Sequence, residues 1–285
     1  MVNIKDYAQA MPIQWCPGCG NFGILAAVRR ALVSLELEPQ RVLMVSGIGQ
    51  AGKFPHYLHC HVLNELHGRP IPAATAAKIA NHELTVIAIS GDGDGYGEGG
   101  NHFMAALTRN VNMTYIVHNN QVYALTKGQA SPTSDPGYVT KTTPEGAWAP
   151  LRALAVAVAC NCSFVARGFS ADMDHLANLI SMGIQHKGFA LIEVLQPCVT
   201  FNHVNTHTWY RERAYKLEDE PGYDPTDRTA AFNKALEWGD RIPIGVIYRA
   251  DRPVYEEQLS ALKAMPLVKQ KIDPLQFEEL LDGFM

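Results

Sequence analysis

The fold is decided by residues 84–120, which read LTVIAISGDGDGYGEGGNHFMAALTRNVNMTYIVHNN. Two apolar runs in this stretch, 84–90 and 113–118, are typical of strands that are buried on both faces of a sheet. The segment between them, 98–109, has the apolar spacing of a helix. A strand, a crossover helix and a second strand form a parallel unit, so the carboxyl ends of both strands emerge at one edge of the sheet.

Polar residues follow both strands at the points where they end. GDG places Asp92 after the first strand, and NN places Asn120 after the second. Ligands bind at this edge of open α/β sheets, and a carboxylate with a carboxamide suits Mg²⁺, which prefers oxygen donors and often shares a diphosphate. The flanking glycines let the backbone approach phosphates closely. Both segments also suit plain turns, but the order of strand, helix, strand and NN favours one site that Asp92 and Asn120 face.

The rest of the chain continues the alternation of strands and helices. Further strands are predicted at 41–46, 163–167 and 190–195, and helices at 21–34, 73–80, 147–160 and 172–186, the last with an N-cap near Ser170. This pattern predicts an α/β fold with a doubly wound, mostly parallel sheet. We expect one domain over residues 1–205 and an extended C-terminal arm over 206–285 that packs on a partner subunit. Within the arm, 242–248 resembles a short strand and 256–263 a short helix.

The bulk composition excludes several classes of protein. The net charge of −4 is unclustered and gives no case for nucleic acid binding. No apolar run approaches the roughly 18 residues of a membrane span, and the N-terminus has no apolar signal core. We therefore expect a cytoplasmic protein. In that compartment the 6 cysteines are reduced, metal-bound or buried rather than paired in disulfides.

The cysteines allow three kinds of site. Cys16 and Cys19 form a CxxC pair, which can grip one metal or form a redox disulfide. Cys60 lies among several histidines, which would permit a structural zinc site. With Cys198, these cysteines also supply the four thiolates of a [4Fe–4S] cluster. The remaining two, at 160 and 162, lie among apolar residues and are expected in the core.

Several long motifs between Trp15 and about Asn202 resemble one family, the β subunits of 2-oxoacid:ferredoxin oxidoreductases, and the 2-oxoglutarate type most closely. They are WCPGCGNFGIL, SGIG, KFPH, HGR, GDGDGYGEGGNHF, NNQVYALTKGQASPTS, FVARGF, HKGFALIEVLQPC and FN. GDG, a spacer of 25 residues and NN form the diphosphate-binding motif of thiamine diphosphate enzymes. The resemblance implies that Mg²⁺ is bound by Asp92, Asn120 and the backbone oxygen of Val122, and that Gly91, Gly93 and Asp94 complete the cofactor site.

The resemblance also implies an activity and its partners. A 2-oxoacid is oxidatively decarboxylated to an acyl-coenzyme A and CO₂, or the reverse carboxylation takes place, and electrons pass through a [4Fe–4S] cluster to ferredoxin. The implied cluster ligands are Cys16, Cys19, Cys60 and Cys198. Many family members have a cysteine directly after SGIG, where this chain has Gln50, so we assign Cys60 to that vacancy. A separate α subunit is expected to supply the catalytic glutamate that activates thiamine.

Four further residues are predicted to act on the substrate. Lys53 is expected to pair with the substrate carboxylate, Leu125 and Lys127 to set specificity, and His67 to contact the cofactor or transfer a proton. The alternatives for Lys53 and His67 are a solvated surface lysine and a structural histidine. Two other classes of function remain open. A non-redox thiamine enzyme, with zinc or no metal at the cysteines, explains the diphosphate motif alone, and a non-catalytic metal scaffold explains the cysteines alone.

Overall fold

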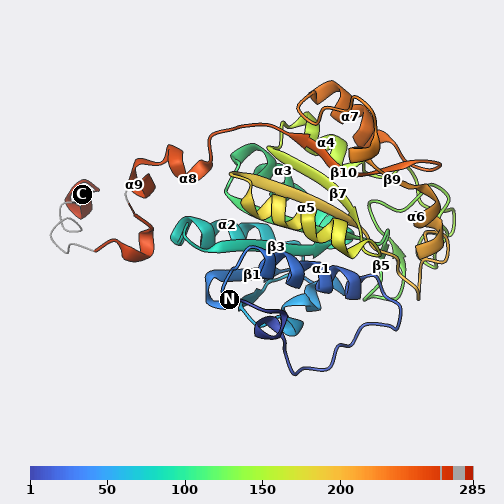
Figure 1. The fold of residues 1–285 in the computed structure, drawn as a ribbon, viewed down its shortest axis with the longest axis horizontal. Coiled ribbons are helices and arrows are strands. Elements are labelled where there is room, and N and C mark those ends of the chain that lie inside the picture. Colours follow the sequence, from blue (N-terminus) through green and yellow to red (C-terminus); the bar gives the residue numbers. More distant parts are fainter. Residues whose placement is uncertain (264, 272–279, 285) are drawn as a thin grey trace.

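A mostly parallel sheet forms the centre of the chain (Figure 1) in a computed structural model that describes residues 1–263, 265–271 and 280–284. Its strands are β1 (Val42–Ser46), β2 (His61–Asn64), β3 (Thr85–Gly91), β4 (Met113–Asn119), β7 (Phe164–Phe169), β8 (Phe189–Leu195), β9 (Ala214–Lys216) and β10 (Ile242–Arg249). They lie in the order β2-β1-β3-β4-β8-β7-β10-β9. Only the pairing of β10 with β7 is antiparallel among the described strands of this sheet. A small hairpin, β5 (Val122–Tyr123) and β6 (Gln129–Ala130), follows β4.

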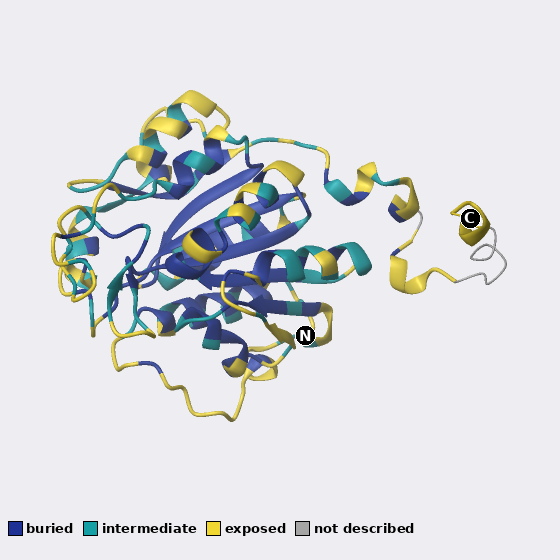
Figure 2. Cartoon of the chain, turned by 180° about the vertical axis from the view of Figure 1, so that it is seen from behind, coloured by how far each residue is buried: buried dark blue, intermediate teal, exposed yellow. Residues whose placement is uncertain are grey.

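Helices cover both faces of the sheet, which confirms the doubly wound α/β fold. One face carries α1 (Asn21–Ser34) and α5 (Met173–Gln185), and the other carries α2 (Pro70–Ala80), α3 (Gly100–Arg109), α4 (Ala153–Ala159) and α7 (Arg228–Leu236). Along β3, Ile87 and Ile89 face the first layer, whereas Val86 and Ala88 face the second, as the two-residue period of a strand requires. Figure 2 shows the strands buried between these layers.

The remaining helices are short. They are α6 (His207–Arg213), α8 (Tyr255–Gln258) and α9 (Ser260–Lys263), with 3-10 turns at Ile4–Tyr7, Pro39–Arg41, Ala51–Tyr57, Leu217–Asp219 and Leu267–Lys269 and a π-helix at Gly93–Glu98. Within the described part of the chain, no helix is long and apolar enough to cross a membrane.

Four predicted helix starts need correction. The helix expected from residue 73 begins at Pro70, because the fixed φ of proline suits the first turn of a helix. The helix expected from residue 147 begins only at Ala153, because Pro150 favours extended backbone before it and the amide of Leu151 bonds the carbonyl oxygen of Pro132 (2.8 Å). The helix expected from residue 98 begins at Gly100, after the π-helix. The N-cap of α5 is Asp172, whose carboxylate accepts from the amide of His175, and not Ser170.

The C-terminal segment belongs to the sheet for much of its length, which corrects the predicted boundary at residue 206. The predicted strand at 242–248 is confirmed as β10, which extends the sheet beside β7. Helix α7 packs on α4 and buries Ala231 and Ala235 in the core. The charged and glycine-rich composition of this region concealed these few apolar contacts. After Arg249 the chain still contacts the main body, because Arg252 donates to the carbonyl oxygen of Leu107 (2.9 Å) and Glu256 accepts from the amide of Asn112 (3.1 Å). The predicted helix at 256–263 forms as α8 and α9, at one end of the molecule (Figure 1).

Candidate active site at the carboxyl edge

The carboxyl ends of β1, β3 and β4 surround a cavity of about 80 Å³. Its lining residues are Ile48, Gly49, Gln50, Ala51, His67, Gly91, Asp92, Gly93, Asp94, Asn120, Val122, Tyr123, Ala124, Leu125 and Thr126. The structure therefore brings Asp92 and Asn120 to one site, as their positions after successive parallel strands predicted. All six residues predicted to hold the cofactor line this cavity.

Asp92 is buried and held in one orientation by two hydroxyl groups. Its Oδ2 accepts hydrogen bonds from Ser131 Oγ (2.5 Å) and Thr133 Oγ1 (2.6 Å). Burial raises the pKa of Asp92 to about 6, and these two hydrogen bonds oppose the rise. No role for Ser131 or Thr133 was expected from the sequence. The only signal for them was the run of hydroxyl residues in SPTS, inside a motif that the family resemblance contains.

The turn after β4 positions two further oxygen donors. Gln121 has a left-handed φ of 60°, and the side-chain oxygen of Asn120 accepts from the amide of Val122 (3.0 Å). Val122 then pairs with Ala130, which brings the hydroxyl residues after β6 back to Asp92. A carboxylate, a carboxamide oxygen and a backbone carbonyl thus line one cavity, and this donor set fits Mg²⁺.

Glycine is required at the position directly after Asp92. A Cβ atom on Gly93 would lie 2.3 Å from the ring of Tyr123, which is too close for any side chain. The ring of Tyr123 in turn lies beside that of His67, with 6.3 Å between centroids. Gly93 therefore lets the backbone after β3 pass close to the aromatic wall of the cavity.

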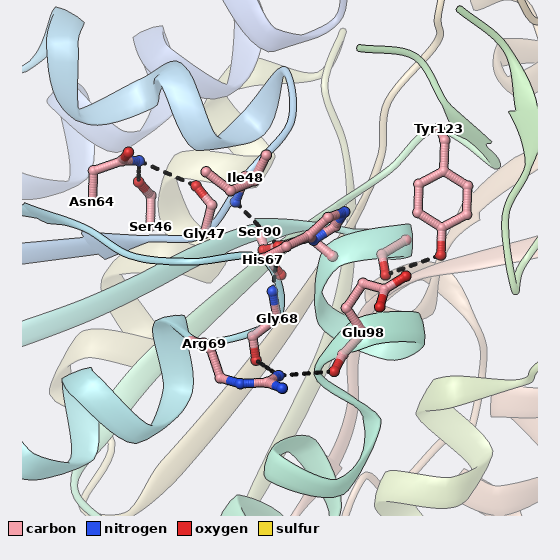
Figure 3. A network of polar contacts seen from close by, with 12 residues as sticks. Ser46, Gly47, Ile48, Asn64, His67, Gly68, Arg69, Ser90, Glu98 and Tyr123 are labelled. Carbon is pink, nitrogen blue, oxygen red and sulfur yellow. Dashed lines mark hydrogen bonds and ion pairs between the residues drawn. The ribbon is translucent and has the colours of Figure 1, made fainter. Parts of the chain in front are cut away.

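Asp94 ties three loops together at the cavity. Its Oδ1 accepts from the amides of Gly68 (2.7 Å) and Ile48 (3.1 Å) and lies 2.6 Å from Nδ1 of His67. Figure 3 shows His67, Gly68 and Ile48 gathered around this point. Burial raises the pKa of Asp94, and these contacts oppose the rise. A Cβ on Gly47 would lie 2.0 Å from Asp94 Oδ2, so this packing also depends on a glycine after β1.

Of the four residues predicted to act on the substrate, two line the cavity and two do not. His67 and the exposed Leu125 line the cavity. Lys53 is half-buried on the 3-10 turn after β1, and Lys127 is exposed with a left-handed φ of 77°. Neither lysine lines the cavity, and the substrate roles of all four residues stay predictions.

Three cysteines line a second pocket of about 30 Å³ beside the first. They are Cys16 and Cys19, which precede α1, and Cys198, which follows β8. Burial raises the pKa of Cys19 to about 11, and the nearby sulfurs of Cys198 and Cys16 add to the rise. This is the reverse of the lowered pKa expected of a reactive CxxC dithiol.

Polar side chains donate to two of these sulfurs, and the two pockets share a wall. Thr200 Oγ1 donates to Cys16 Sγ (3.1 Å), and Gln196 Nε2 donates to Cys19 Sγ (3.4 Å). Hydrogen bonds of this kind tune sulfur ligands in metal sites. Gln50, Asn120 and Ala124 line both the cysteine pocket and the cavity around Asp92.

Cys60 does not lie at this pocket, which corrects its assignment to the cluster. It directly precedes β2, which runs parallel to β1, so Cys60 lies at the amino end of the sheet. Cys198 follows the carboxyl end of β8, at the opposite edge. Cys60 Sγ donates to the carbonyl oxygen of His61 (3.3 Å), its side chain packs on the core, and burial raises its pKa to about 12.

The other metal site suggested by the sequence does not form. Within the described residues, no three His, Cys, Asp or Glu side chains lie close enough to hold a single metal ion. Thiolates on one tetrahedral zinc ion lie about 3.8 Å apart, as follows from zinc–sulfur bonds of about 2.3 Å. Cys162 is buried and Cys160 packs against the same core, as predicted.

Comparison with known proteins agrees with this geometry. Residues 46–194 match the family described as thiamine pyrophosphate enzyme, C-terminal TPP binding domain, and residues 198–264 match the family of the C-terminal part of the pyruvate ferredoxin oxidoreductase beta chain. The β subunit of a 2-oxoacid:ferredoxin oxidoreductase from a Sulfolobus species is 47% identical over 260 residues, which cover 87% of this chain and 85% of the relative. The chain belongs to the 2-oxoacid:ferredoxin oxidoreductase β subunits.

Other relatives of this oxidoreductase subunit are of the 2-oxoglutarate type. The KorB subunit of the 2-oxoglutarate oxidoreductase from Mycobacterium tuberculosis is 41% identical over 199 residues, which cover 70% of this chain and 53% of the relative. The solved 2-oxoglutarate:ferredoxin oxidoreductase from Magnetococcus marinus, with 2-oxoglutarate, coenzyme A and succinyl-CoA bound, matches with a TM-score of 0.91 and 34% identity. This match covers 98% of this chain and 96% of that one. The likeness thus extends well beyond Asn202 into the C-terminal segment, where the sequence motifs had shown none.

Proposed function

We propose that this β subunit, together with an α subunit, oxidatively decarboxylates 2-oxoglutarate to an acyl-coenzyme A and CO₂, or catalyses the reverse carboxylation. Electrons pass through an iron–sulfur cluster at the cysteine pocket to ferredoxin. The observation that carries this proposal is the shared wall of Gln50, Asn120 and Ala124 between the two pockets, because a cluster in the cysteine pocket would then lie next to a cofactor in the first cavity. The ligands of the Magnetococcus marinus enzyme support the choice of substrate and of coenzyme A.

The first pocket is suited to hold the cofactor by its diphosphate. Asp92, Asn120 and the carbonyl oxygen of Val122 would bind Mg²⁺, with phosphate oxygens and water completing the shell. Hydrogen bonds from Ser131 and Thr133 fix the orientation of the Asp92 carboxylate. When bound, thiamine diphosphate supplies the electron sink for cleavage of the bond between the keto carbon and the carboxylate.

Four residues are proposed to act on the substrate. Asp94 accepts a hydrogen bond from Nδ1 of His67, which leaves Nε2 of that imidazole as the nitrogen able to contact cofactor or substrate. Lys53 is proposed to pair with a substrate carboxylate, and Leu125 and Lys127 to select among substrates.

The activating glutamate is proposed to come from the α subunit. Among the described residues that line the cavity, the carboxylates are Asp92 and Asp94 alone. Asp92 is engaged by two hydroxyl groups, and Asp94 is engaged through Oδ1 by two amides and His67, while its Oδ2 is buried against Gly47. Neither is therefore available to activate the aminopyrimidine ring, so another chain has to supply this group.

An anaerobic visible spectrum of the purified complex, with counts of iron, acid-labile sulfide and thiamine diphosphate, tests the proposal. We expect about four irons per β chain and a broad visible band that bleaches when 2-oxoglutarate and coenzyme A are added together. Because the partner chain can hold a cluster of its own, the count is repeated on a complex with Cys198→Ser. Zinc or no metal, with thiamine diphosphate still bound, would instead assign the chain to a non-redox thiamine enzyme.

A further inference from the structure

The cysteine pocket is one thiolate short of a complete cluster site. Cubane clusters are held by four protein ligands, usually cysteines. Cys16, Cys19 and Cys198 line the pocket, and Cys60 lies at the opposite edge of the sheet. The other two cysteines, at positions 160 and 162, pack in the hydrophobic core. Every cysteine of the chain is thereby accounted for, so a fourth ligand from this chain has to be another kind of side chain.

Gln50 is the side chain in the right place. It follows β1 at the carboxyl edge and lines the pocket with the three cysteines. Its backbone oxygen accepts from Trp15 Nε1 (2.9 Å), which fixes it next to the CxxC segment. Its side-chain oxygen is buried and has no hydrogen-bond partner among the described residues. A buried acceptor without a partner costs about 1–3 kcal/mol, so such groups usually mark a ligand or a water.

Gln196 is the competing candidate, because it lines the same pocket and its side-chain oxygen is also buried without a partner among the described residues. Its amide nitrogen, however, donates to Cys19 Sγ (3.4 Å) and to the carbonyl oxygen of Pro197 (2.9 Å). The donor end of Gln196 therefore faces the sulfur, and the oxygen on the same planar amide points another way. Among the described contacts, the side chain of Gln50 makes no hydrogen bond that would commit it to another role.

We propose that Gln50 is the fourth ligand of the cluster and binds one iron through its amide oxygen. This inference rests on the proposed redox function and deepens it. An amide oxygen is neutral and hard, whereas a thiolate is anionic and soft. One iron is therefore held less tightly than the other three, and the cluster carries one negative charge fewer. The lower charge raises its reduction potential relative to an all-cysteine cluster.

The weakly held iron can be removed by mild oxidation. Ferricyanide accepts one electron from [4Fe–4S]²⁺, the iron–ligand bonds at the unique site break, Fe²⁺ leaves, and [3Fe–4S]⁺ remains. For the wild-type complex we expect loss of about one iron in four and the EPR signal of an oxidised three-iron cluster. In ⁵⁷Fe Mössbauer spectra of the untreated complex, we expect one iron of four as a separate component.

Three variants and a control isolate the role of Gln50. Gln50→Cys supplies a thiolate and should keep all its iron under ferricyanide while the separate Mössbauer component disappears. Gln50→Glu keeps the shape of the side chain and adds a negative charge. Because a carboxylate binds iron more tightly than a neutral amide, this variant should lose iron more slowly. Gln50→Ala should yield the three-iron form without oxidation. The matched control, Gln196→Ala, should lose iron as the wild type does, because it removes hydrogen bonds to Cys19 and to the carbonyl oxygen of Pro197 but no iron ligand.

The outcomes separate this inference from the proposed function. A wild-type cluster that resists ferricyanide, or iron loss that is the same in Gln50→Cys, Gln50→Glu and wild type, would overturn the role of Gln50 and leave the redox function intact. Loss of the separate iron component in Gln196→Ala would assign the ligand to Gln196 and also overturn it. A wild-type complex with thiamine diphosphate but no iron or sulfide would overturn both.

Discussion

The two neighbouring pockets are built from the chain in opposite ways. The cavity around Asp92 takes its oxygen donors from one strand, helix, strand unit and the hairpin that follows it, so its parts lie close in sequence. The cysteine pocket takes its polar lining residues from the segment before α1, from the end of β1 and from the end of β8. Its parts meet only when the whole sheet has formed.

The pockets also differ in how far the protein alone completes them. The Asp92 carboxylate is already oriented by Ser131 and Thr133, as in a site shaped before its ion arrives. The cysteine pocket contains two buried amide oxygens without partners among the described residues, those of Gln50 and Gln196, and the first cavity contains one such carboxylate oxygen, Oδ2 of Asp94. The Asp92 carboxylate is thus preorganised, whereas these three oxygens have no hydrogen bond that orients them among the described contacts. Damage to one should therefore leave the other loaded.

The largest effect is expected from Asp92→Ala. Loss of a metal ligand removes several kcal/mol of charge stabilisation, so turnover should fall by a factor on the order of 1,000 or more. Thiamine diphosphate should no longer be retained in the presence of Mg²⁺, while iron and sulfide contents stay at the wild-type level. Cofactor and metal analyses on the same sample check both points. Loss of the cluster together with thiamine would show that the pockets are not independent and that Asp92 supports the fold.

The paired variants Cys198→Ser and Cys60→Ser test the cysteine pocket in the same way. Cys198→Ser should lose the visible band of the cluster and keep thiamine diphosphate, whereas Cys60→Ser should retain full iron. Because the pKa of Cys60 is raised to about 12, its thiol should also react slowly with iodoacetamide near pH 8. Iron loss in Cys60→Ser at undiminished thermal stability would contradict the placement of Cys60 at the amino end of the sheet.

A smaller effect is expected from Thr133→Val, which keeps the shape of the side chain and removes the hydroxyl group. Residues that orient a metal ligand typically change metal affinity by about 10–100-fold when they are lost. Mg²⁺ should therefore activate the variant at higher concentrations, with near-normal turnover at saturation. A matched control is Thr126→Val, which lines the same cavity without contacting Asp92. Equal Mg²⁺ requirements in the two variants would reject preorganisation of Asp92 by Thr133.

Local patterns were sufficient to predict the strands and the first pocket. Apolar runs located β1, β3, β4, β7, β8 and β10, and the polar residues directly after β3 and β4 located Asp92 and Asn120. These features depend on sequence neighbours and on one rule for parallel sheets, so no long-range information was needed.

The errors share a physical cause, which is contact between distant segments. The edge strand β2 consists of HVLN with every residue exposed, so no burial pattern marked it, and without it the path of Cys60 could not be followed. Ser131 and Thr133 reach Asp92 only through the two-residue strands β5 and β6, which are too short for a periodic signal. The antiparallel addition of β10 likewise depends on contacts that local composition does not reveal.

The smallest effect is expected at the substrate end, where Lys53→Ala and Lys127→Ala form a matched pair. Neither lysine lines the cavity, so either would act through a flexible side chain in a solvated region, where one ion pair contributes about 1 kcal/mol. If Lys53 pairs with the substrate carboxylate, its loss should raise the KM for 2-oxoglutarate about five- to tenfold with thiamine binding unchanged, and Lys127→Ala should change the preference among 2-oxoacids instead. Steady-state kinetics with 2-oxoglutarate and pyruvate distinguish the two roles. An unchanged KM in Lys53→Ala would return this lysine to the solvated surface and leave carboxylate recognition to His67 or to the α subunit.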